Sequence, residues 1–148
     1  KECYPSGGGG QKPLNNQWQQ PKTDWQAGDY FNIEDYNRIK GNLNEIRTQA
    51  LNLYPDFEFE NMGVDKTYQD YSFYADEINR FEDNLEKICA GTFPFTIGEK
   101  KTFSENTPFI QWDELNRIES ACLKIYNNII SGIEGRLQLA FVLNGGEF

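Results

Sequence analysis

Three copies of one nine-residue pattern decide the fold of this 148-residue chain: FNIEDYNRI at residues 31–39, FYADEINRF at 73–81 and IQWDELNRI at 110–118. Each copy holds an acidic dipeptide, one apolar residue and an Asn-Arg pair in the same order. Self-similarity of this kind indicates a repeated structural unit. The chain is therefore expected to build one unit three times.

The spacing of apolar residues around each Asn-Arg pair is helical. Counted from the Asn, apolar residues recur at positions −1, +2, +6 and +9 in all three copies, and steps of three and four are typical of an amphipathic helix. Asn32 with Asp35 predicts a helix start, and Gly132 predicts the end of the third helix. The predicted helices cover residues 33–53, 75–90 and 111–131.

Two shorter segments have the alternating pattern of β-strands. Residues 92–103 alternate aromatic and polar side chains and predict a hairpin about Gly98-Glu99. Near the end of the chain, the alternation of leucines and Phe141 predicts a strand over residues 137–143, before a turn at 144–146. The expected fold class is mainly α: a small three-helix bundle built from three repeated helical motifs, with a minor β-hairpin and a C-terminal strand.

The first residues differ in composition from the rest. Residues 1–24 are rich in Gly, Pro, Asn and Gln, which predicts a flexible linker. Residues 25–148 are then a single helical domain with a short C-terminal β element. Because the chain begins with Lys1 and not Met, we expect a processed or excised product that once had something attached upstream.

Composition excludes several classes of function. The net charge of −9 argues against nucleic acid and anionic membranes as partners, and no apolar run approaches the roughly 20 residues of a membrane span. The absence of His excludes Ser-His-Asp and Cys-His catalysis and His-ligated metals. We predict no cofactor. Cys89 and Cys122 are expected to be inert thiols, with a bridge between them left open.

The Asn-Arg pairs allow two interpretations: a ligand site built three times, or an architectural element. In the architectural interpretation, which we favour, Arg pairs with an acidic residue of a neighbouring copy and Asn bonds a loop carbonyl. The acidic dipeptides are interpreted as solvated first helical turns, because they lack the spacing of a calcium loop. The six residues of this structural repeat motif are Asn37, Arg38, Asn79, Arg80, Asn116 and Arg117.

Aromatic residues make up 15% of the chain. Such side chains close small cores, and they are also favoured at protein interfaces; a sugar-binding platform is a third interpretation. The candidate interface aromatics are Trp25, Tyr68, Tyr71, Tyr74 and Trp112.

Several of these stretches resemble a segment of minor structural, tail-associated proteins of tailed phages and prophages of Gram-positive bacteria. The resemblance covers roughly residues 21–130 and implies a virion component without catalytic residues. The stretches that carry it are PKTDW at 21–25, DYFNIEDYNRI at 29–39, YADEINRFE at 74–82, GEKKT at 98–102 and LNRIE at 115–119.

The function expected from the repeat, the linker and this resemblance is that of a noncatalytic structural and assembly domain of a phage or prophage tail. Its expected partners are other tail proteins or further copies of itself, and its location is the virion. The alternative is a carbohydrate-binding or adhesion module on a bacterial surface or tail tip, with a host glycan as ligand. An enzyme is not expected, although a carboxylate-based glycosidase is the third hypothesis.

Overall fold

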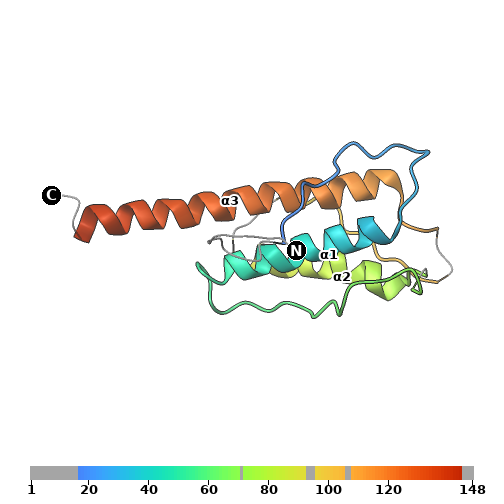
Figure 1. Cartoon of the computed structure of the whole chain (residues 1–148), viewed down its shortest axis with the longest axis horizontal. Helices are drawn as coiled ribbons and strands as arrows, with labels where there is room; N and C mark the ends of the chain where they lie inside the picture. The colour runs from blue at the N-terminus through green and yellow to red at the C-terminus, as the bar shows by residue number, and fades with distance from the viewer. Residues whose placement is uncertain (1–16, 71, 93–95, 106–107, 145–148) are drawn as a thin grey trace, which may run out of the picture.

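The three predicted helices are present and form a bundle in the computed structural model (Figure 1). They are α1 (Ile33–Ala50), α2 (Ala75–Gly91) and α3 (Trp112–Asn144). The structure describes residues 17–70, 72–92, 96–105 and 108–144, with side chains as far as residue 136. The prediction of a mainly α, three-helix fold is confirmed.

The acidic dipeptides begin the helices, as their position in the repeat predicts. At α1, the N–H of Asn32 donates to the Asp35 carboxylate at 3.0 Å, and the N–H of Asp35 donates to Oδ1 of Asn32 at 3.2 Å. This reciprocal capping box satisfies two backbone donors that the helix itself leaves open. At α2, the N–H of Tyr74 donates to the Glu77 carboxylate at 3.0 Å.

The helices run parallel, with all three N-termini at the same end of the bundle (Figure 1). Phe31, Phe73 and Phe109 each lie two or three residues before their helix, and their rings meet. The ring centroids are 5.1 Å apart for Phe31–Phe73, 5.6 Å for Phe31–Phe109 and 6.0 Å for Phe73–Phe109. A parallel bundle needs long connections, so residues 51–74 and 92–111 carry the chain back to the starting end after α1 and α2.

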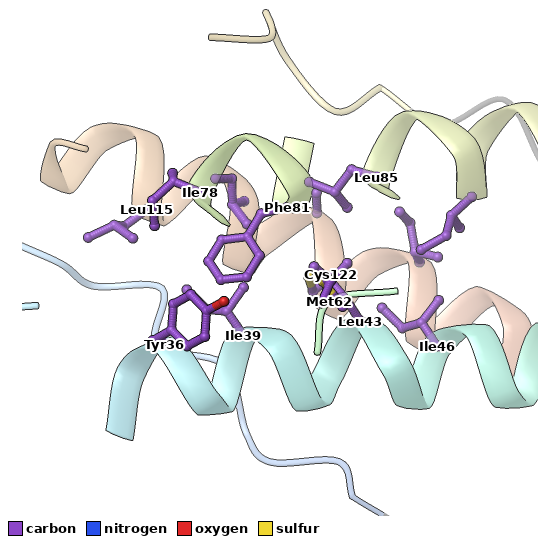
Figure 2. Packing of buried hydrophobic residues seen from close by; sticks show 14 of the residues in the cluster. Tyr36, Ile39, Leu43, Ile46, Met62, Ile78, Phe81, Leu85, Leu115 and Cys122 are labelled. Carbon is purple, nitrogen blue, oxygen red and sulfur yellow. The ribbon is translucent and has the colours of Figure 1, made fainter. Parts of the chain in front are cut away.

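The apolar stripes of the repeat form the core between the helices (Figure 2). All twelve side chains at positions −1, +2, +6 and +9 are 3% exposed or less. Phe81 of α2 lies at the centre, with its ring centroid 5.2 Å from that of Tyr36 of α1. The twelve are Tyr36, Ile39, Leu43 and Ile46 of α1; Ile78, Phe81, Leu85 and Ile88 of α2; and Leu115, Ile118, Cys122 and Ile125 of α3.

The segment that precedes α1 is packed along the bundle from its first described residue. The ring of Trp18 stacks on that of Tyr126 in α3, with centroids 3.8 Å apart and an interplanar angle of 7°. Pro21 and Trp25 are buried. Residues 17–24, which composition assigns to a flexible linker, are therefore part of the packed structure. The remainder of that predicted linker, residues 1–16, lies outside the described residues.

The predicted C-terminal strand is wrong, because residues 137–143 continue α3. The 33 residues of α3 span about 50 Å at 1.5 Å per residue, against about 27 Å for the 18 residues of α1, and α3 projects past the other two helices (Figure 1). Gly132 does not end the helix; it lies against the side chain of Leu53. Because no partner strand lies in the described part of the chain, a helix is the conformation that satisfies this backbone.

The predicted hairpin about Gly98-Glu99 is also not formed in the residues that can be examined. Residues 96–103 contain no strand, and residues 93–95 lie outside the described residues. Gly98 has a φ of 80°, which L side chains rarely adopt, and its Cα lies close to the side chain of Arg117. The positive φ of Gly98 and its lack of a side chain therefore allow residues 96–103 to lie against Arg117 of α3.

Candidate interaction surface

The repeated Asn side chains hold the connecting segments against the helices. In each case Nδ2 donates to the carbonyl of one loop residue, while Oδ1 accepts from the N–H of the same residue. A side-chain amide satisfies both backbone groups of an extended residue in this way, as a neighbouring β-strand would. The pairs are Asn37 with Lys66, Asn79 with Phe103 and Asn116 with Trp25, all at distances between 2.8 and 3.0 Å.

These three Asn clamps close a ring around the bundle. Asn37 of α1 holds the segment that leads into α2, and Asn79 of α2 holds the segment that leads into α3. Asn116 of α3 holds the segment that leads into α1. Each helix thus fixes the approach to the next one, and the third copy returns to the first.

A second row of clamps lies five residues further along two of the helices. Asn42 makes the same paired contact with Gln19, at 2.8 Å in both bonds. Asn84 makes it with Glu60, at 2.7 and 3.0 Å. The third copy has Ala121 at this position. The sequence analysis did not identify this row, although an Asn at +5 in two copies was visible in the repeat.

Arg38 forms an ion pair with a buried carboxylate of the neighbouring copy. Its Nε and Nη2 donate to the two carboxylate oxygens of Glu119 at 2.9 and 2.7 Å, and Nη1 donates to Asp35 at 2.9 Å. Glu119 is 1% exposed and also accepts from Nε1 of Trp25 at 2.7 Å and from the N–H of Lys22 at 3.0 Å. One carboxylate therefore joins α1, α3 and the N-terminal segment.

Arg117 repeats this arrangement between α3 and α2. Its guanidinium donates to the buried carboxylate of Glu82, to Glu114 at 3.0 Å and to the carbonyl of Ile97 at 2.9 Å. Glu82 occupies the same place in its copy as Glu119 does in the third, three residues after the Asn. Burial raises the pKa of Glu82 above its ordinary value, and the charge of Arg117 opposes that shift.

The third member of this set departs from the pattern. Three residues after Asn, the first copy has Lys40 where the others have Glu, so Arg80 has no carboxylate to meet there. Arg80 instead bonds Asp76 at 3.3 Å, while Lys40 is buried and pairs with Asp65 at 2.6 Å. All three Asn-Arg pairs are engaged with other parts of the chain, as expected of an architectural motif.

The candidate interface aromatics divide into buried and exposed groups. Trp25 is 3% exposed and belongs to the core. Tyr68, Tyr74 and Trp112 are 79%, 61% and 43% exposed, respectively. Tyr71 lies outside the described residues.

The exposed aromatics gather at the N-terminal end of the bundle. Tyr30 and Phe109, which the sequence analysis did not single out, are 89% and 42% exposed and lie just before α1 and α3. Tyr68 reaches the first turn of α1 through a 2.9 Å bond from its hydroxyl to Glu34. A cleft of about 320 Å³ opens beside Tyr30, Phe109 and Trp112, and Tyr68 and Tyr74 lie outside it. Its lining includes Trp25, Asp29, Tyr30, Phe109, Gln111 and Trp112. We call this surface the aromatic end.

In each acidic dipeptide the first carboxylate is exposed at the aromatic end and the second is paired within the chain; two of the exposed carboxylates also have a partner, Glu34 in the hydroxyl of Tyr68 and Asp76 in Arg80. The first members are exposed, and the second members pair with a cation, because adjacent helical residues point in different directions. The exposed members are Glu34, Asp76 and Asp113. The engaged pairs are Asp35 with Arg38, Glu77 with Lys66 and Glu114 with Arg117, at 2.9 Å each.

Little on the described surface indicates reaction chemistry. No three acidic or Cys side chains come together there in a way that could hold a metal ion. No disulfide joins Cys89 to Cys122, and burial raises the pKa of the Cys122 thiol well above its ordinary value. Within the same residues, no helix combines the length and the apolar character that crossing a bilayer requires.

Comparisons with known proteins identify no relative whose function could be compared with this site. No protein-family model, no curated protein and no solved structure matches the chain.

Proposed function

We propose that this chain is a noncatalytic structural and assembly domain that contacts its partner through the aromatic end. The observation that carries the proposal is the position of the exposed rings. Of the six large hydrophobic side chains that are most exposed in the described residues, five lie at the helix N-termini, and Val64 is the exception. Exposed Trp and Tyr side chains that gather at one place are typical of the energetic centre of a protein interface.

The rest of the molecule supports a role as a rigid scaffold. The clamps and the buried ion pairs engage the residues of the repeated motif within the chain, so the motif serves the fold. Among the described residues, the exposed large apolar side chains other than Val64 lie at the aromatic end. We place the domain in a phage or prophage tail, in the virion, as the resemblance of its repeated segments implies, with other tail proteins as partners.

Incorporation into particles tests this proposal. We expect mass spectrometry of purified particles from the source strain to detect the chain at a fixed ratio to tail proteins. Replacing Trp112 and Tyr74 together by Ser is expected to reduce incorporation about tenfold or more, because truncating central interface aromatics typically costs 2 kcal/mol or more. Circular dichroism checks that the helices are retained in this variant.

Val64→Ser is the matched control, because Val64 is 88% exposed but lies on the flank of the bundle. The carbonyl of its neighbour Gly63 bonds Nζ of Lys40 in the second turn of α1, which fixes that location. We expect this variant to enter particles as the unaltered chain does. Absence of the unaltered chain from particles would contradict the assignment to the tail. Equal incorporation of all variants would contradict the aromatic end as the contact surface.

A further inference from the structure

The aromatic end already holds cations of its own against its rings. Nζ of Lys66 lies 5.2 Å from the ring centroid of Tyr36 and 5.8 Å from those of Phe73 and Tyr74. Nζ of Lys22 lies 5.0 Å from the ring centroid of Trp25. These distances are within the range of about 6 Å for attraction between a cation and an aromatic face. Two lysines of the chain therefore already lie against aromatic rings at this end of the bundle.

The most exposed rings of the cleft lack such a partner within the described chain. Trp112 and Tyr30 both line it, and no described Lys or Arg lies over either ring. The cleft is accessible, since Tyr30 is 89% exposed and Trp112 is 43% exposed. A cation supplied by another molecule would find on these rings the kind of contact that Lys66 makes with its own.

The charges around these rings favour a cation as well. Glu34 and Asp113 are exposed in the first turns of α1 and α3. Asp76 in the first turn of α2 is also exposed but pairs with Arg80, and Asp29, which lines the cleft, pairs with Lys22. The nearby lysines each have a carboxylate partner, because Lys22 pairs with Asp24 and Asp29, Lys66 pairs with Glu77 and Nζ of Lys101 lies 3.9 Å from Oε2 of Glu114. The aromatic end therefore presents an excess of negative charge around exposed rings.

We propose that the aromatic end binds a basic segment of a partner protein, with Lys or Arg side chains over Trp112 and Tyr30 and in reach of the exposed carboxylates. The proposal rests on the proposed function and adds the chemistry of the partner. A second copy of this chain fits poorly, because each copy has a net charge of −9 and the two would repel. A neutral sugar could donate hydrogen bonds from its hydroxyl groups to these carboxylates but would gain no net Coulombic attraction, whereas a basic segment gains both.

Calorimetric titration with model peptides tests this inference on the full chain. Nonaarginine is the basic probe, with nonaglutamate and a neutral Gly-Ser peptide of the same length as comparisons and cellohexaose as the sugar. We expect nonaarginine to bind and its affinity to fall as NaCl rises from about 50 to about 300 mM, because exposed charges are screened. The other three probes are expected to give no heat of binding.

Three variants locate the binding site. The double variant Glu34→Gln/Asp113→Asn is expected to weaken nonaarginine binding about fivefold to tenfold, through the loss of two rim charges. Trp112→Ala is expected to weaken it about two- to fivefold, the usual effect of one cation over an exposed ring. The matched control is Asp56→Asn/Glu58→Gln, which removes the same charge from two exposed residues that follow α1, at the opposite end of the bundle.

The result that supports the inference is weaker binding in the first two variants and unchanged binding in the control. An equal loss in the control would overturn it, since it would show attraction by net charge alone. No binding of nonaarginine, or binding of cellohexaose at the same site, would also overturn it. If nonaarginine fails to bind while Trp112→Ser/Tyr74→Ser still prevents entry into particles, the proposed function stands and only the basic partner is wrong.

Discussion

Replacing Glu119 by Ala is expected to lower the free energy of unfolding by about 3–5 kcal/mol, the usual cost of removing one partner from a buried ion pair. The Arg38 guanidinium would lose both bonds to this carboxylate, and the indole N–H of Trp25 would lose its acceptor. Arg38, whose side chain is only 14% exposed, would then have only Asp35 to balance its charge. Urea denaturation followed by circular dichroism measures the change.

Two further substitutions show whether the effect comes from this buried site. Glu58→Ala removes a carboxylate whose side chain is 91% exposed, so its effect should stay within about 0.5 kcal/mol. Glu119→Gln keeps the shape of the side chain and removes the charge, and its cost should fall between the two. A loss below about 1 kcal/mol for Glu119→Ala would contradict the role of Glu119 as the junction of α1, α3 and the N-terminal segment.

Phe81→Ala is expected to destabilise the bundle by about 3–5 kcal/mol, the range for removing a fully buried Phe. Phe81 is 0% exposed and packs against Tyr36. The three helices surround it, so the cavity left behind can collapse only in part. Thermal and urea unfolding both measure this loss. Tyr30→Ala removes an aromatic side chain that is 89% exposed and should change stability little; a comparable loss there would contradict this account of the core.

The helices and the core could be predicted from the sequence because one signal recurs three times. All twelve residues of the apolar stripe are buried as predicted, and the capping of α1 by Asn32 and Asp35 is confirmed. A single amphipathic pattern is ambiguous. Three copies with the same apolar spacing and the same acidic first turn all indicate a helix, so the local signals agree with one another. The contacts expected of the motif, Asn to a loop backbone and Arg to an acidic residue of a neighbouring copy, are also present for Asn37, Arg38 and Arg117.

The length of α3 could not be predicted, because its sequence fits two periods at once. Leu137, Leu139, Phe141 and Leu143 alternate as in a strand, and an apolar run with few polar positions fits a helix equally well. A helix satisfies its backbone N–H and C=O groups within itself, whereas a strand needs hydrogen bonds from a neighbouring strand. The choice between the two therefore depends on whether a partner strand exists elsewhere in the chain. Gly132 added to the error, because close approach to Leu53 and not helix termination accounts for a Gly there.

The aromatic end could be predicted only in part, because which rings are exposed depends on how the chain returns along the bundle. Trp25 and Trp112 both lie near the start of a repeat helix in the sequence. Asn116 clamps Trp25 into the core, whereas Trp112 begins α3 and stays 43% exposed. Sequence position alone does not separate the two residues, since the contact that buries Trp25 joins residues 91 positions apart.

The central claim is that the repeated Asn residues close a ring of clamps, and hydrogen exchange at three loop amides tests it most directly. The N–H groups of Trp25, Lys66 and Phe103 donate to Asn116, Asn37 and Asn79. We predict that these amides exchange at least about 100-fold more slowly than in an unfolded peptide. Asn79→Ala should abolish the protection of Phe103 while α2 remains helical. Exchange of all three amides at the unfolded rate, or protection of Phe103 that survives Asn79→Ala, would contradict the claim.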